Sequence, residues 1–428
     1  MKQVIFVFLF LSAGFLTAQE ALPLADPADF GLDGARIQKQ ADSIIANGIK
    51  NEAFPGAEVL VAKEGKVIFQ KAYGFHTYDS IHPVRMTDLY DLASVTKIMG
   101  PLPAIMRLVE QGKLNLDVPF SQYWRPWRHH RDKKDLTLRE ILAHQAGLQP
   151  YIVFLNEVLR NGQLKRRFIR HHPGRRFQNQ AYDSLYVKTR FRRKMYRMIN
   201  RSEVSQEKTY RYSGMAFLIF PELITRLTGT NYETYLRKEF YDPLGCHTLV
   251  FNPAKKGLAD RVVPTEKDTL YRKDLTHGWV HDENASLLGG VSGNAGLFGT
   301  AADLWRMMQM YQNYGTFEGK RYLAEPVVRQ FTWVQYPEND NRRGLGFDKP
   351  LPGNAEKPLS EAYPAPSASA ASFGHSGFTG TFVWADPVNQ LVFIFLCNRV
   401  YPYRDHRTLY SSNLRPALQQ VFYSDKAK

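Results

Sequence analysis

Two pairs of strand-like segments lie at opposite ends of this 428-residue chain, and they restrict its fold more than any other feature. The first pair comprises residues 58–62 and 67–72, and the second comprises residues 380–385 and 390–396. Each pair is separated by a short stretch of turn-forming residues, which is typical of a β-hairpin. Because the two ends resemble each other more than either resembles the middle, we predict one antiparallel sheet built from both ends of the chain.

Helical patterns flank and separate these strand pairs. A helix carrying Ile37 and Ala41 should stop near Gly48, and residues 414–422 should form a closing helix. The middle contains a helix broken at Gly100-Pro101. Further helices are expected after the capping-box pair Thr137 and Glu140, over 215–227, over 232–240 and after Thr300. The fold class is therefore α/β plus α, with helices on the sheet and an inserted, mostly helical domain.

These patterns divide the chain into predicted parts. Residues 1–18 resemble a secretory signal peptide, with Lys2, an apolar run and a small residue at position 18. The remaining residues, 19–428, form one predicted domain with two parts. Its sheet part spans about 27–92 and 287–428, and its helical part spans about 100–286. We expect a protein secreted across the cytoplasmic membrane, periplasmic or extracellular, in which Cys246 and Cys397 are buried free thiols.

Ser94 and Lys97 are three residues apart at a predicted helix start, so their side chains should share one face. A serine hydroxyl needs a neighbouring base to act as a nucleophile, and a lysine whose charge is disfavoured can assist. A helix start also offers backbone N–H groups to an oxyanion. The same spacing is common in capped surface helices, so this pair alone does not establish a catalytic site.

Two later segments accompany this pair. Tyr212 lies in Tyr-Arg-Tyr-Ser-Gly, and a tyrosine can act as a base when positive charge, here from Lys97, stabilises its phenolate. His375-Ser376-Gly377 should start a strand, where the missing side chain of Gly377 lets substrate approach the backbone. The N–H of Phe378 could then join that of Ser94 around an oxyanion.

In order and spacing, these motifs resemble the serine β-lactamase and penicillin-binding protein superfamily. Within it, the similarity is to the class C-like branch with D-alanyl-D-alanine carboxypeptidases and esterases. The matching elements are Ser94-Val95-Thr96-Lys97, Tyr212-Ser213-Gly214 and His375-Ser376-Gly377. Residues 136–148, 242–245 and 289–300 resemble the same branch, so the likeness runs from Phe54 to about Val400. A β-lactamase/transpeptidase-like fold is implied.

The resemblance also implies roles for individual residues. Ser94 would attack a carbonyl carbon and form an acyl-enzyme, while Tyr212 and Lys97 move protons. The implied catalytic residues are Ser94, Lys97, Tyr212 and His375, and the implied substrate-binding residues are Ser376, Gly377, Phe378 (through its backbone), Tyr151 and His281. No cofactor is implied. Residues 277–284 carry two histidines, but no second ligand cluster accompanies them, so we expect no metal.

The implied substrate is a peptidoglycan stem peptide, cleaved by a D,D-carboxypeptidase or endopeptidase. Gly214 stands where many relatives carry an amide residue that contacts the substrate, which puts efficient β-lactam hydrolysis in doubt. A broad-specificity esterase or weak β-lactamase is therefore an alternative. A catalytically silent binding or scaffold protein is another, although the intact Ser94, Lys97 and Tyr212 disfavour it.

Residues 160–201 hold fourteen Lys or Arg against one acid, Asp183, a net +13 of the chain's formal +15. This basic insertion lies between the first and second motifs, so it should rim the substrate pocket. Nucleic acid is a poor partner for an exported enzyme. An anionic cell-wall polymer or membrane surface fits better, and a solvated basic face without a partner is equally compatible with the composition.

Overall fold

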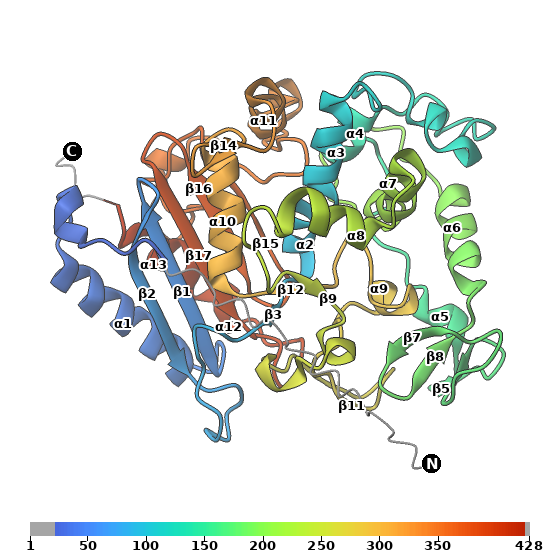
Figure 1. Cartoon of the computed structure of the whole chain (residues 1–428), viewed down its shortest axis with the longest axis horizontal. Helices are drawn as coiled ribbons and strands as arrows, with labels where there is room; N and C mark the ends of the chain where they lie inside the picture. Colours follow the sequence, from blue (N-terminus) through green and yellow to red (C-terminus); the bar gives the residue numbers. More distant parts are fainter. Residues whose placement is uncertain (1–21, 424–428) are drawn as a thin grey trace, which may run out of the picture.

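The computed structural model describes residues 22–423, so the predicted signal peptide at 1–18 lies outside the described residues. Its central feature is a five-stranded antiparallel sheet in the order β15-β16-β17-β1-β2 (Figure 1). The strands are β1 (Gly56–Lys63), β2 (Lys66–Gly74), β15 (Phe373–Ser376), β16 (Phe382–Asp386) and β17 (Leu391–Cys397). Strand β1 pairs with both β2 and β17. The prediction of one antiparallel sheet built from both chain ends is confirmed.

The strand β15 differs from the sequence-based prediction. The segment His375-Ser376-Gly377 was expected to start a strand, but β15 begins at Phe373 and ends at Ser376, on the edge of the sheet. Gly377 instead opens a turn that leads into β16, because its N–H donates to the carbonyl oxygen of Thr381 at 2.7 Å. The third motif is therefore at the end of a strand, where the chain leaves the sheet.

Helices cover both faces of this sheet. Helices α1 (Gly34–Lys50) and α13 (Leu414–Gln420) share one core cluster with the sheet residues Val59 and Phe393. On the other face, α10 (Ala301–Gln312) begins after Thr300, whose side chain accepts a hydrogen bond from the Asp303 N–H. Every residue of α10 is buried, because the helix lies between the sheet and the rest of the molecule (Figure 1).

The middle of the chain supplies most of the other helices. Helix α2 (Thr96–Met99) ends at Gly100 and α3 (Pro101–Glu110) follows at once, as Gly100-Pro101 predicted. The Thr137–Glu140 capping box starts α4. The remaining α-helices are α4 (Leu138–Leu142), α5 (Leu155–Val158), α6 (Phe191–Arg201), α7 (Phe220–Thr228), α8 (Tyr232–Leu236), α9 (Glu283–Leu287), α11 (Glu325–Thr332) and α12 (Thr408–Ser411).

Short strands accompany these helices, and several lie in the basic insertion. That segment forms a hairpin and a small three-stranded sheet before α6 begins, so only about its last quarter is helical. Apart from the main sheet, the strands are β3 (Tyr90–Asp91), β4 (Leu159–Arg160), β5 (Gln163–Leu164), β6 (Ile169–Arg170), β7 (Asn179–Tyr182), β8 (Leu185–Val187), β9 (Val250–Phe251), β10 (Lys267–Asp268), β11 (Asp274–Leu275), β12 (Leu297–Gly299), β13 (Thr316–Phe317) and β14 (Lys320–Arg321).

One large apolar core joins the sheet to the helical part. It runs from Leu60 and Ile394 on the sheet, through α10, to Phe217 and Ile224 beside α7. Within residues 22–423, no helix combines the length and apolarity needed to cross a bilayer. Cys246 and Cys397 are buried and free, as expected. Packing between the two parts therefore positions the segments that lie at their junction.

Candidate active site

Ser94 lies in a sharp turn between β3 and α2. The backbone of Ala93, just before it, has φ +43°, a left-handed conformation that is uncommon for a residue with a side chain. The carboxylate of Asp91 stabilises this turn by accepting a 2.8 Å hydrogen bond from the Ala93 N–H. Lys97 Nζ then lies 2.9 Å from Ser94 Oγ. The two side chains share one face, as their spacing predicted.

The ammonium group of Lys97 is buried and well coordinated. Only 2% of the residue is exposed, and its Nζ also donates to the carbonyl oxygen of Asn294 at 2.9 Å. The rings of Tyr212 and Phe217 each have their centroid 5.4 Å from Nζ. A buried charge needs such partners, because leaving water without them is costly.

Tyr212 lies close to two cations. Besides Lys97, the guanidinium carbon of Arg343 lies 5.7 Å from the centroid of the tyrosine ring. Among the described residues, the buried phenol oxygen of Tyr212 has no hydrogen-bond partner. Buried polar groups are rarely left unpaired, and a catalytic role is one established reason for an exception. Tyr212 thus presents an uncommitted hydroxyl where positive charge stabilises negative charge.

Two buried histidines flank Tyr212, and both are held neutral. Burial lowers the pKa of His375 to about 3, and the charges of Arg343 and Lys97 contribute to this shift. The same causes hold the pKa of His144 well below its usual range. Ring centroids of His144 and Tyr212 are 4.5 Å apart, and those of His375 and Tyr212 are 6.1 Å apart. Positive charge near the tyrosine therefore comes from the lysine and the arginine.

Arg343 and its partners were missed in the sequence. Its guanidinium Nη1 lies 3.3 Å from an Asp348 carboxylate oxygen, and Arg342 contacts the same oxygen at 2.8 Å. Burial alone would raise the pKa of Asp348, but the two arginines hold it below its usual value. The backbone of Asp348 also pairs with Gly374 of β15. This ion cluster thus connects the site to the edge strand.

The turn after β15 is fastened to the residues just before Ser94. Thr379 Oγ1 donates to the carbonyl oxygen of Asp91 at 2.7 Å, and Thr381 Oγ1 donates to that of Leu92 at 3.2 Å. A Cβ atom added at Gly377 would lie 2.7 Å from the Leu92 oxygen and overlap the hydroxyl of Thr381. Only glycine permits this close approach, which brings Gly377 and Phe378 beside the Ser94 turn.

The side chain of Phe378, beside the Ser94 turn, is 43% exposed, and its covered side contacts two other residues. The Arg399 guanidinium carbon lies 4.4 Å from its ring centroid, and Arg399 Nε donates to its carbonyl oxygen at 2.8 Å. The imidazole of His281 stacks on the same ring. His281 is only 4% exposed and its Nε2 lies 2.8 Å from Glu266. Phe378 and Glu266 cover most of its ring, and the contact of His281 with substrate stays a prediction.

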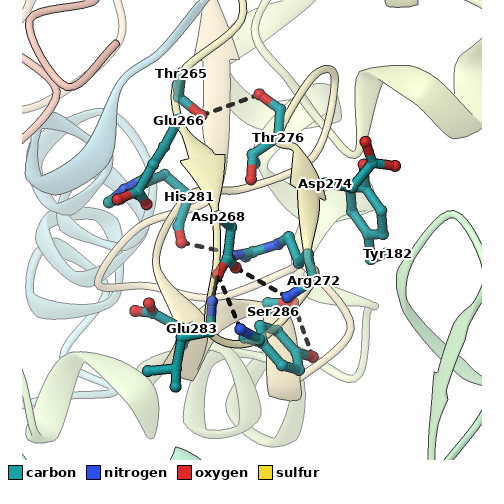
Figure 2. A network of polar contacts seen from close by, with 12 residues as sticks. Tyr182, Thr265, Glu266, Asp268, Arg272, Asp274, Thr276, His281, Glu283 and Ser286 are labelled. Carbon is teal, nitrogen blue, oxygen red and sulfur yellow. Dashed lines mark hydrogen bonds and ion pairs between the residues drawn. The ribbon is translucent and has the colours of Figure 1, made fainter. Parts of the chain in front are cut away.

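A polar network fixes the backbone around His281 (Figure 2). Arg272 donates to the carbonyl oxygens of Val280 at 2.6 Å and of His281 at 3.1 Å, and the buried carboxylate of Asp268 pairs with Arg272 at 2.9 Å. Arg404 contacts Glu266 at 2.6 Å. Burial alone would raise the pKa of Glu266, but His281 and Arg404 lower it to about 2. Glu266 is therefore charged under ordinary conditions.

Residues 281–284 connect several parts of the site. The N–H of His281 donates to Asp91 at 2.6 Å, and Asp282 accepts a 3.1 Å hydrogen bond from the side chain of Asn294. Asn284 donates to the carbonyl oxygen of Ile152 at 3.0 Å. This segment thus links the Ser94 turn, the residue whose carbonyl binds Lys97, and the loop at 147–152.

The other predicted substrate-binding residues lie around this centre. Tyr151 is 46% exposed on the 147–152 loop, and Ser376 is half-buried at the end of β15. Gly214 follows Tyr212 closely, and its N–H donates to the Pro150 carbonyl oxygen at 3.2 Å. In residues 22–423, no group of three or more His, Cys, Asp or Glu side chains is arranged to hold a metal ion.

Ser94 contacts a buried lysine at the junction between the helical part and a sheet built from strands at both ends of the chain. This arrangement is that of the serine hydrolases of the β-lactamase fold. The chain belongs to the Beta-lactamase family, whose family model matches residues 41–414. The sequence-based identification of this superfamily is confirmed. This identification was possible from the sequence because the three motifs occur in the expected order.

Curated relatives and solved structures agree with this assignment. A protein of Salmonella enteritidis named "Putative D-alanyl-D-alanine carboxypeptidase" is 29% identical over 416 residues, covering 91% of this chain and 89% of that protein. The structure of EstCE1, described as a hydrolase with promiscuous acyltransferase activity, has a TM-score of 0.66 at 16% identity, covering 91% of this chain and 99% of that one. A penicillin-binding protein homologue from Caulobacter crescentus has a TM-score of 0.61 at 19% identity, covering 90% and 97%. The two structural matches concern the fold alone.

Proposed function

We propose that this protein is an exported D,D-carboxypeptidase or endopeptidase that cleaves peptidoglycan stem peptides through an acyl-enzyme at Ser94. The observation that carries the proposal is the 2.9 Å contact between Lys97 Nζ and Ser94 Oγ inside a β-lactamase-family fold. A hydroxyl alone is a weak nucleophile, and this contact places it beside a fixed positive charge. Export is supported by the signal-peptide pattern of residues 1–18.

In the proposed acylation step, Ser94 Oγ attacks the carbonyl carbon and its proton passes to the phenolate of Tyr212. Lys97 and Arg343, which lie near the tyrosine ring, stabilise that phenolate. The N–H groups of Ser94 and Phe378 stabilise the negative charge on the substrate oxygen. When the C–N bond breaks, Tyr212 returns the proton to the leaving amine, and an ester remains on Ser94.

Deacylation reverses this sequence with water as the nucleophile. Water gives a proton to Tyr212 as it attacks the ester carbon, and the proton then returns to Ser94 when the acyl–oxygen bond breaks. His375 is neutral in this scheme and lies beside Tyr212, so it serves as a polar neighbour rather than a cation. Ser376, at the end of β15, is the proposed contact for the substrate carboxylate.

Two observations support the peptide substrate. The relative of Salmonella enteritidis that carries the carboxypeptidase name aligns with 91% of this chain. In addition, Lys97 and Arg343 lie near the ring of Tyr212, and both nearby histidines are neutral, so two cations lie beside the tyrosine. A stem peptide ends in a carboxylate, and positive charge in a confined site favours its binding.

A broad-specificity esterase or weak β-lactamase is the second candidate, and Gly214 favours it. A Cβ atom added at Gly214 would meet only the Cβ of Asn294, at 3.9 Å, so the site is open at this position. An open position imposes little selection on the acyl side chain of a substrate. The intact catalytic set argues against a silent scaffold protein.

Intact-mass analysis tests this proposal and separates the candidates. The protein is incubated with a penicillin, an activated ester and a peptide ending in D-Ala-D-Ala. We expect a covalent adduct that is absent from Ser94→Ala, together with release of D-alanine from the peptide. Cleavage of the activated ester without release of D-alanine would favour the esterase. Absence of an adduct with every acyl donor would contradict the nucleophile itself.

A further inference from the structure

A row of cations lines a groove beside the active-site loop. The groove has a volume of about 900 Å³ and lies between helix α6 and the loop that contains Gln149 and Ile152. Five cations contribute to its lining: Arg190, Arg193, Lys194, Arg197 and Arg201. Thus only five of the fourteen cations of the basic insertion line this groove.

Most of these cations have no protein anion to neutralise them. Arg190, Arg193, Arg197 and Arg201 are exposed, and the described part of the chain offers none of them an ion pair. By contrast, Lys194 pairs with Glu157, and Arg192, which is outside the groove, lies 3.9 Å from Glu222. Like charges that are held together repel each other, so an external anion in the groove would stabilise this arrangement.

The spacing of the cations follows the helix. Phe191, Met195 and Ile199 bury the opposite side of α6, which fixes the orientation of the helix. Positions 190, 193, 197 and 201 recur every three or four residues and 194 lies next to 193, so the five cations form a stripe. At 1.5 Å per residue the stripe is about 16 Å long, and the cations at 190, 193, 197 and 201 are about 4.5–6 Å apart along the axis. Alternate side chains of an extended polypeptide repeat at about 6.6–6.8 Å, so the spacing of anions along an extended chain is of the same order as the spacing of the cations.

The groove shares a wall with the catalytic site. The carbonyl oxygen of Gln149 accepts a 2.6 Å hydrogen bond from Ser213 Oγ, and Ser213 directly follows Tyr212. Ile152, at the other end of this loop segment, is held by Asn284. A chain bound in the groove would therefore lie against the same loop that borders Tyr212 on its other side.

We propose that the groove between α6 and the 147–152 loop binds a linear polyanion, a strand carrying carboxylate or phosphate groups, and holds it beside the active site. Four of the five lining cations are arginines, whose planar guanidinium groups bind both kinds of anion through paired hydrogen bonds. A concave site accepts a narrow strand, whereas a flat bilayer surface would contact only its rim. This inference goes beyond the hydrolase proposal and does not depend on it.

Fluorescence anisotropy with labelled poly-L-glutamate tests the proposal, with inorganic polyphosphate as a second probe. The Ser94→Ala protein is used, so that the result is independent of acyl-enzyme chemistry. The groove variant replaces Arg190, Arg193, Arg197 and Arg201 by Gln. The control variant replaces Arg166, Arg167, Arg175 and Arg176 by Gln. These four are exposed cations of the same insertion that do not line the groove, so both variants lose the same charge.

We expect binding that weakens as salt rises, because screening shortens the reach of charge to about 8 Å at 0.15 M salt. The groove variant should bind about tenfold or more weakly, whereas the control variant should change less than about threefold. Melting temperatures of both variants establish that they fold. An equal loss in the two variants, or none in the groove variant, would overturn the assignment of the groove.

Two competing occupants are tested in the same way. Vesicles of phosphatidylcholine and phosphatidylglycerol in equal amounts represent a membrane surface, and a short DNA duplex represents nucleic acid. The proposal requires that both bind more weakly than the polymers. Tighter binding of vesicles or duplex that is lost in the groove variant would overturn the choice of a linear polymer.

Discussion

The imidazole of His281 stacks on the ring of Phe378, with centroids 5.6 Å apart and planes inclined by 24°. The two residues are far apart in sequence, and their contact joins the Glu266 network to the turn that carries the proposed oxyanion donor. Because the Phe378 ring is otherwise exposed, His281 and Arg399 are what hold it in place. We therefore expect His281 to act as a positioning residue, through Phe378.

Replacing His281 should slow acylation without weakening substrate binding. We expect His281→Ala to lower kcat by about 10- to 100-fold, because a small displacement of the oxyanion donor is costly, while KM changes little. His281→Phe keeps a ring against Phe378 and should recover part of the loss. Steady-state kinetics with an activated ester measure both effects.

A neighbouring histidine provides the control for this prediction. His277 Nε2 contacts the carbonyl oxygen of Val262 at 2.7 Å, so His277→Ala also removes a polar contact from this region. We expect its kcat to stay close to that of the parent protein. If His277→Ala and His281→Ala slow the reaction equally, the effect comes from general loosening rather than from Phe378.

Lys97 and Tyr212 should behave as one unit. Lys97→Met and Tyr212→Phe should each lower turnover by roughly 10² to 10⁴, the range expected when a general base is lost. The double variant should be little worse than either single variant, because both residues serve the same proton transfer. Stopped-flow acylation rates, together with the adduct mass, provide the measurement.

Tyr241→Phe is a matched control for the loss of a buried phenol. The Tyr241 hydroxyl donates to the carbonyl oxygen of Met99 at 3.0 Å, at the far end of α2 from Ser94. Its removal should cost about 1 kcal/mol of stability and leave acylation near normal. Normal turnover in Tyr212→Phe would instead move the base role to Lys97 or His375.

Gly377 should tolerate no side chain. In Gly377→Ala the new Cβ would clash with the Leu92 carbonyl oxygen and the Thr381 hydroxyl, so the turn must move away from Ser94. We expect the rate of acylation to fall by about 100-fold, as it does when a catalytic group is displaced. Gly174→Ala is the control, because a Cβ there meets nothing within 4 Å. Comparable rates for the two variants would mean that the close approach at Gly377 is dispensable.

The sequence predicted the parts of this molecule that depend on local pattern. Short apolar runs separated by turn-forming residues specified β1, β2, β16 and β17, and the Ser94–Lys97 spacing specified the contact between these two residues. In contrast, Asn294 binds Lys97 through its backbone carbonyl. Because any residue type offers such a carbonyl, the sequence gives no signal for this contact. Arg343 and Asp348 are charged residues in a loop, and only tertiary packing buries them against Tyr212. The strands of the basic insertion are only two to four residues long and have no periodicity to detect.

The buried histidines make the stability of the protein depend on pH. Folding holds the pKa of His375 at about 3 and that of His144 well below its usual range, whereas both would have ordinary values near 6.5 in the unfolded chain. As the pH falls below 6.5, the unfolded state therefore binds protons that the folded state does not, and stability decreases. Between pH 7 and 4.5, His375 should contribute a loss of about 2.5 kcal/mol, and His144 a loss in the same direction.

Urea denaturation at pH 7, 6, 5 and 4.5 measures this loss, and asparagine variants identify its source. His144→Asn and His375→Asn keep a polar group at the Nδ1 position but cannot be protonated, so each should flatten the fall in stability with decreasing pH. His172→Asn, at an exposed position, should not change it. Buried acids with raised pKa, such as Glu58, act in the opposite direction, so the decisive quantity is the difference between each variant and the parent. Identical pH profiles for all four proteins would show that neither buried histidine resists protonation in the folded state.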